Sequence, residues 1–229
     1  MHKKTKNIIA AGIVVIPFYL SAFLQKTLIN QSDIYVQKFL SIYMLLSIIG
    51  IMAIVIINKY FLKNKWEVFA YPKGKLIIDI SLAFLILSLH YFINSLGKIT
   101  FFRWISTDID RTVIINLLTE IFSNNLYGFI MVGPFNWLNE LFAVLSIAFL
   151  LNNLWEINNK KYWIWTSIII TSILFTLLQI DQGIPTMINT FIIISISNCI
   201  YYRYRRIYPL LIAAIIYQTI DLISFWVYF

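Results

Sequence analysis

Long apolar runs recur along the whole of this sequence, and short polar stretches separate them. A helix needs about 20 mainly apolar residues to cross a lipid bilayer. Seven segments reach or approach that length: residues 8–24, 38–58, 76–95, 132–153, 162–180, 185–202 and 207–228. The pattern predicts an all-α fold, a polytopic transmembrane helical bundle of about seven spans.

The stretch 100–131 departs from this pattern. It holds an apolar run from Val113 to Leu118, which polar residues follow at once. A full extra span there would move Lys160 and Lys161 to the other side of the membrane, away from the earlier basic loops. We therefore expect an interfacial or re-entrant helix over residues 112–130.

Composition supports the membrane assignment. Of the 229 residues, 60% are hydrophobic and 12% are charged, whereas soluble domains carry about 25% charged residues. The single cysteine, Cys199, excludes a disulfide-rich scaffold. The net charge of +8 comes from short loops, where basic residues set topology and contact lipid head groups, so we expect the lipid bilayer and not nucleic acid as a partner.

The distribution of basic residues predicts the orientation. Loops with a basic excess, at residues 1–7, 59–75, 154–161 and 203–206, alternate with nearly neutral ones. The positive-inside rule then predicts a cytoplasmic N-terminus and an external C-terminus. The basic and apolar N-terminal stretch resembles a signal peptide, but no small-residue cleavage site follows, so we expect a retained first span.

Polar side chains inside the last four predicted spans are the candidates for function, because such residues are costly in a bilayer. They fall at similar depths and predict one buried polar cavity between these spans. A second interpretation, hydrogen-bonded or protonated packing residues, stays open. The candidates are Asn139, Glu140, Gln179, Asp181, Asn189, Tyr217, Gln218 and Asp221.

We expect neither a metal nor a cofactor. Zinc sites use His, Cys and carboxylate ligands, and both His90 in the third span and Cys199 near the inner end of the sixth are expected to lie far from the cluster. His90 is interpreted as an interhelical hydrogen-bonding residue. The basic and aromatic run 201–206 is expected to be an interfacial anchor.

From about residue 132 to 225 the chain resembles the CAAX-protease and bacteriocin-processing family of intramembrane proteases (the CPBP or Abi family). That family has three motifs: a Glu-Glu pair, three residues and Arg; Phe, three residues and His; and His, three residues and then Asn or Asp. The matching stretches here are Asn139-Glu140 to Val144, Phe175 to Gln179, and Tyr217 to Asp221, with Ala214 to Gln218 as another register. Both motif histidines are absent.

The resemblance implies a CPBP-like helical core at 132–229 that follows N-terminal spans and the interfacial segment at 1–131, all in one membrane domain. It also implies a degenerate member. We expect a non-catalytic bacterial membrane protein that binds a peptide or a membrane partner, in bacteriocin self-immunity or as a cell-envelope scaffold. Two alternatives are an active peptidase with Glu140 as its base, and a permease subunit of a peptide transporter.

Overall fold

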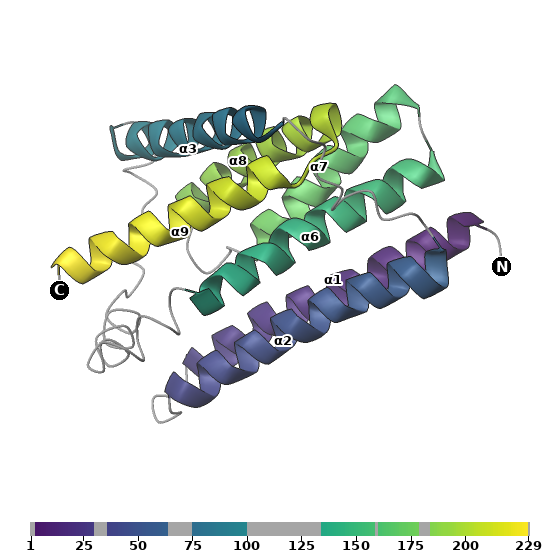
Figure 1. Cartoon of the computed structure of the whole chain (residues 1–229), viewed down its shortest axis with the longest axis horizontal. Coiled ribbons are helices and arrows are strands. Elements are labelled where there is room, and N and C mark those ends of the chain that lie inside the picture. The colour runs from purple at the N-terminus through teal and green to yellow at the C-terminus, as the bar shows by residue number, and fades with distance from the viewer. Residues whose placement is uncertain are drawn as a thin grey trace.

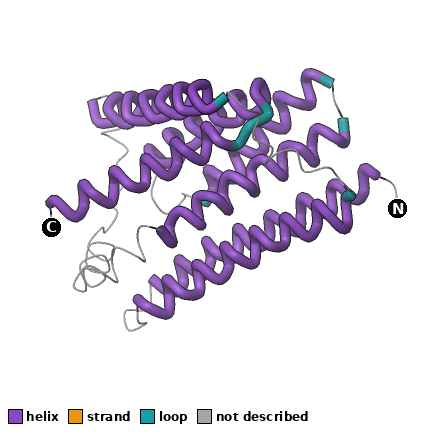
Figure 2. Tube along the Cα trace, in the orientation of Figure 1, coloured by secondary structure: helices purple, strands orange, loops and turns teal. Residues whose placement is uncertain are grey.

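The computed structural model describes residues 3–29, 36–63, 75–99, 134–158, 160–178 and 184–228. Every regular element in these ranges is a helix, so the all-α prediction is confirmed for the described chain (Figures 1 and 2). The elements are α1 (Lys3–Ile29), α2 (Val36–Ile56), the π-helix η1 (Ile57–Leu62), α3 (Leu76–Ile99), α6 (Pro134–Ile157), α7 (Lys161–Leu177), α8 (Ile184–Tyr204) and α9 (Tyr208–Tyr228).

Prolines mark three of the helix starts. Pro134 is the first residue of α6, and Pro185 and Pro209 are the second residues of α8 and α9. The first turn of a helix tolerates proline because its N–H groups have no partner within the helix. Beyond these prolines each helix continues with many apolar residues. The helix bonds the backbone N–H and C=O groups within the segment, as a bilayer requires.

The helix α6 forms the centre of the bundle. It packs against α1 and α2 on one side and against α7, α8 and α9 on the other (Figure 1). Its stretch Val144–Leu151 is buried throughout. The helix α3 lies on the outside and packs against α8 and α9.

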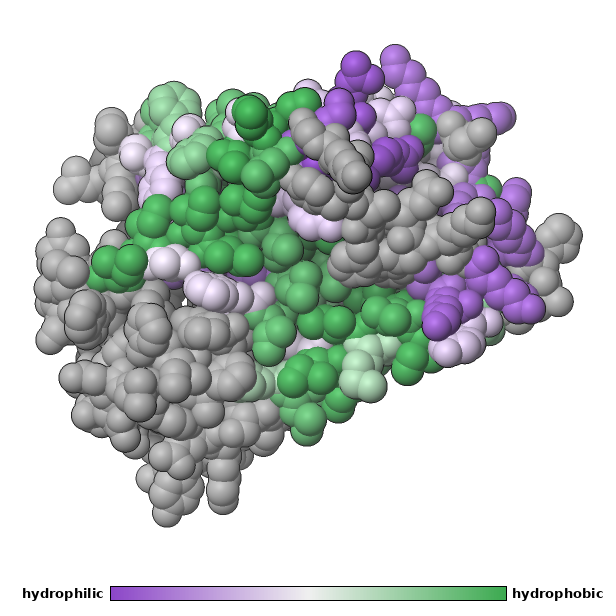
Figure 3. Space-filling model, in the orientation of Figure 1, coloured by the Kyte–Doolittle hydropathy of each residue, from purple (hydrophilic) through white to green (hydrophobic). Residues whose placement is uncertain are grey.

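One end of the bundle gathers most of the basic residues of the described chain. Contacts between Lys3 and Glu156, Lys6 and Phe61, and Arg205 and Trp155 join the start of α1, the end of α6, η1 and the end of α8 there. Hydrophilic side chains cover this end in Figure 3, while hydrophobic ones cover the middle. We call it the basic end, and define it by Lys3, Lys4, Lys6, Lys59, Lys63, Lys75, Lys160, Lys161, Arg203, Arg205 and Arg206.

Three helices are long and apolar enough to cross a membrane by length and composition. They are the segments Met44–Leu62, Leu76–Leu96 and Trp137–Ile157, counted within the described residues. This is fewer than the seven spans that the sequence predicted. The described residues hold two further apolar helical stretches of 10–17 residues, Lys161–Leu177 and Tyr208–Ile220. The predicted helix at 112–130 lies outside the described residues, but α3 ends and α6 begins at the same end of the bundle, opposite the basic end (Figure 1).

Candidate functional site

Glu140 and Gln218 meet between α6 and α9. The amide Nε2 of Gln218 donates a hydrogen bond to Oε1 of Glu140 at 2.8 Å. Both side chains are half-buried. The contact joins the first motif stretch of the sequence to the third, 78 residues further along the chain, so two of the predicted site residues do face one another.

The chemistry of this pair is that of an acid held by a neutral amide. A carboxylate accepts hydrogen bonds, and a primary amide donates them without gaining or losing a proton near neutral pH. In a medium of low polarity such a bond is stronger than in water, and leaving the acid without a partner is more costly. The hydrogen bond therefore holds the Glu140 side chain in place, but Gln218 cannot accept or release a proton beside it.

Asn139 and Asn189 point to other helix interfaces. Asn139 Oδ1 accepts a hydrogen bond from the hydroxyl of Ser47 on α2, and Asn189 Nδ2 donates one to Oδ1 of Asn94 on α3. The sequence predicted that both residues line one cavity between the last four spans, whereas α2 and α3 supply these two hydrogen-bond partners.

His90 lies closer to the candidate residues than the sequence indicated. Its ring centroid is 4.1 Å from that of Tyr217, and the ring of Tyr91 is 5.8 Å from Tyr217. Tyr217 is the neighbour of Gln218 along α9, so the expectation that His90 lies far from the cluster is wrong. The sequence does show that His90 lies well inside the third apolar run. Nothing in that run shows that α3 packs on α9.

Of the remaining candidate residues, the structure describes the side chain of Phe175 alone. Phe175 is buried in the hydrophobic core near the end of α7. Gln179 and Asp181 lie outside the described residues, and Asp221 belongs to α9 but its side chain is not among those described. Within the described part of the chain, no three His, Cys, Asp or Glu side chains come together as a set of metal ligands.

Further polar side chains tie one helix to another elsewhere in the bundle. Asn152 Nδ2 donates to the hydroxyl of Tyr201 at 2.7 Å, joining α6 to α8, and Asn198 Nδ2 donates to Ser172 Oγ at 3.1 Å, joining α8 to α7. Hydrogen bonds of this kind add about 0.6–2 kcal/mol each to helix association in membranes. The interpretation of buried polar groups as packing residues therefore fits many of them.

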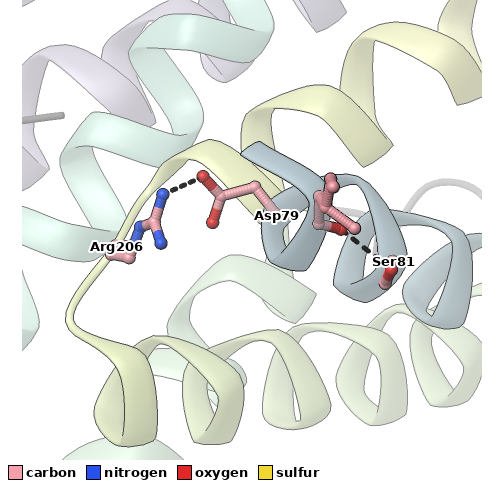
Figure 4. A network of polar contacts seen from close by, with 4 residues as sticks. Asp79, Ser81 and Arg206 are labelled. Carbon is pink, nitrogen blue, oxygen red and sulfur yellow. Dashed lines mark hydrogen bonds and ion pairs between the residues drawn. The ribbon is translucent and has the colours of Figure 1, made fainter. Parts of the chain in front are cut away.

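The run 201–206 is only partly the exposed anchor that the sequence predicted. Arg203, Tyr204 and Arg205 are exposed, but Tyr201 and Arg206 are buried. Arg206 forms an ion pair with Asp79 in the first turn of α3 (Figure 4). Burial of a cation requires such a partner, and the sequence analysis had not singled out Asp79.

In comparisons with known proteins, no family model, curated protein or solved structure matches the chain. The resemblance to the CPBP family stays a prediction from the motif stretches.

Proposed function

We propose that the chain is a bacterial multi-pass membrane protein that crosses the bilayer seven times, with its basic end in the cytoplasm. Three helices meet the length and hydropathy requirements for a span, and the other helices of the described chain pack alongside them in the same bundle. The gathering of lysine and arginine at one end supports a cytoplasmic location for that end. This orientation places the N-terminus inside and the C-terminus outside.

We also propose that the protein works without hydrolysis, by binding a hydrophobic peptide or a transmembrane segment of a partner. The observation that carries the proposal is the hydrogen bond from Gln218 to Glu140. Peptide-bond hydrolysis needs a general acid that protonates the leaving amine as well as a base that activates the water, and Gln218, a neutral amide, cannot act as that acid. The family resemblance adds self-immunity against a bacteriocin, or scaffolding of envelope enzymes, as roles for a non-catalytic member.

A second candidate function, a glutamate-dependent intramembrane peptidase, is favoured by one observation. His90 packs against Tyr217, which stands where one register of the third motif has its histidine. An imidazole at that level is a group that transfers protons near neutral pH. The two proposals differ in whether Glu140 and His90 are needed for chemistry.

Purified protein in lipid vesicles tests both candidates. A set of hydrophobic peptides is added, cleavage is followed by mass spectrometry, and binding by fluorescence anisotropy of a labelled peptide. We expect binding without cleavage, with equal affinity for the parent protein, Glu140→Gln and His90→Gln. Cleavage by the parent that either variant abolishes would reject the non-hydrolytic function in favour of the peptidase.

The matched control for binding is Ala143→Trp. Ala143 is half-buried on α6, one turn beyond Glu140, and an indole there disturbs helix packing without removing a polar group. We expect this variant to lower peptide affinity while Glu140→Gln does not. Unchanged affinity in all variants, at a level equal to that of vesicles without protein, would contradict peptide binding.

A further inference from the structure

Arg205 follows the last residue of α8 in a backbone conformation that favours glycine. Its φ is 54°, in the left-handed region, and its N–H donates to the carbonyl oxygen of Tyr201 at 2.7 Å. Many helices end this way, but glycine or asparagine usually occupies the position because a Cβ is disfavoured there. An arginine at this position therefore suggests a functional role for its side chain.

The guanidinium of Arg205 lies on an aromatic platform. It is 4.2 Å from the centroid of Trp155 on α6 and 5.3 Å from that of Tyr202 on α8. Trp155 in turn stacks on Tyr201 at 5.9 Å, and Asn152 donates to the hydroxyl of Tyr201. Trp155 and Tyr201 are buried and Tyr202 is half-buried. Because these rings come from two helices, the platform restricts the rotamers of an otherwise flexible side chain.

Arg205 remains exposed although the ring of Trp155 that it contacts is buried. The two described acids at this end have other cationic partners: Glu156 pairs with Lys3, and Asp79 pairs with Arg206. Arg203, in the last turn of α8 and two residues before Arg205, is also exposed. A guanidinium that stacks on a ring still presents its N–H groups in the plane of the fork, which matches the oxygens of a phosphate.

We propose that Arg205, supported by Arg203, binds the phosphate of one anionic phospholipid at the α6–α8 corner of the basic end. Exposed aromatic side chains at the same end, Tyr204 on α8 and Tyr162 on α7, suit the headgroup level of a bilayer. The proposal depends on the membrane location of the chain and not on the binding of a peptide. Its ligand is a lipid phosphate rather than a soluble one, because the platform lies where helix ends meet the interface.

The test uses the full chain in detergent micelles, with phosphatidylglycerol as the probe and phosphatidylcholine as the neutral comparison, and counts bound lipid by native mass spectrometry. We expect one phosphatidylglycerol to bind with a Kd about tenfold below that of phosphatidylcholine. Arg205→Gly is expected to remove this preference without lowering the melting temperature, because glycine accepts the left-handed backbone more readily. Arg205→Lys keeps the charge but loses the fork, and is expected to lose part of the preference.

Lys63 provides the matched control, since it also has φ of 54° at a helix end and lies at the basic end. Lys63→Gly removes one charge from the same end, so an equal loss of lipid binding in both glycine variants would show a diffuse charge effect and overturn the site. Retention of lipid preference in Arg205→Gly would overturn it as well. Displacement of the lipid by millimolar glycerol phosphate would reject the lipid as the source of the phosphate, whereas no displacement supports it.

Discussion

Arg206 and Asp79 form a buried ion pair between the α8–α9 connection and the first turn of α3, 127 residues apart in the chain. Arg206 Nη2 donates to Asp79 Oδ2, and the Asp79 side chain has no exposed surface. A charge buried without its partner is strongly unfavourable, whereas the pair satisfies both charges. The pair therefore fixes where α3, the outer helix, begins against α8 and α9 (Figure 4).

Replacement of one partner is expected to be strongly destabilising. Asp79→Ala leaves the guanidinium of Arg206 buried without its counter-charge, and we expect the free energy of unfolding to fall by about 3–5 kcal/mol. Denaturant titration in mixed micelles measures the change. The double variant Asp79→Leu with Arg206→Met is expected to recover most of this loss, because it removes both charges.

The exposed ion pair of Lys3 with Glu156 is the control, since 73% of the Lys3 side chain surface is exposed. Lys3→Ala is expected to cost less than about 1 kcal/mol. A similar small loss in Asp79→Ala would show that the Arg206 site admits water and that the ion pair does not hold α3.

The sequence predicted the helices well because their signal is local. The apolar run predicted at 76–95 became α3 at Leu76–Ile99, and the run at 207–228 became α9 at Tyr208–Tyr228. The length of an apolar run is a property of one segment, so it can be read without knowing which helices pack together. The 3.6-residue repeat is weak in such segments, because lipid and helix neighbours are both apolar.

The polar contacts were harder to predict from the sequence, because each joins helices that are far apart along the chain. Glu140 and Gln218 were paired through their depth and the motif stretches, and the structure places them in contact. Ser47, Asn94 and the position of His90 were missed, since depth alone does not say which face a residue occupies. An apolar run shows that α3 is a helix, but its neighbours are set by packing that a single sequence does not display.

Gly50 permits the close approach of α2 to α6. A Cβ built on Gly50 would collide with the ring of Phe142. We therefore expect Gly50→Ala to lower the free energy of unfolding by about 1–3 kcal/mol, the usual cost of overpacking. Thermal unfolding in micelles measures it, and Phe142→Leu in the same chain should relieve part of the loss.

Gly12 on α1 is the comparison, because a Cβ there would meet nothing within 4 Å. Gly12→Ala is expected to leave stability unchanged or to raise it by up to about 1 kcal/mol, since alanine is the better helix former. If Gly50→Ala behaved like Gly12→Ala, the contact between Gly50 and Phe142 would not be a tight one.

The bond between Gln218 and Glu140 is expected to make a modest contribution to stability. Gln218→Leu removes the donor, and we expect a loss of about 1 kcal/mol, near the range for interhelical hydrogen bonds in membranes. Glu140→Gln keeps an acceptor oxygen at the same place and should cost less. The measurement is a double-mutant cycle of unfolding free energies with Glu140→Leu and Gln218→Leu, each of which removes one partner of the bond.

Thr219, the next residue along α9, gives the control for that cycle. Its hydroxyl bonds to the carbonyl oxygen of Ile215 within the same helix, at 2.7 Å, so Thr219→Val removes a polar group without breaking a contact between helices. We expect no coupling between Thr219→Val and Glu140→Leu. Equal coupling for Thr219 and Gln218 would contradict a specific pair.

The orientation of the chain is testable with single cysteines in a Cys199→Ser background, since Cys199 is the one native cysteine. Lys63 and Lys161 are exposed at the basic end, and Ser95 is exposed near the far end of α3, roughly 28 Å from Leu76 at 1.5 Å per residue. Because basic loops stay in the cytoplasm, a membrane-impermeant maleimide should label Ser95→Cys in intact cells. It should label Lys63→Cys and Lys161→Cys only after the cells are permeabilised. Labelling of both lysine positions from outside would reverse the proposed orientation, and labelling of all three positions from one side would show that α3 does not cross the membrane.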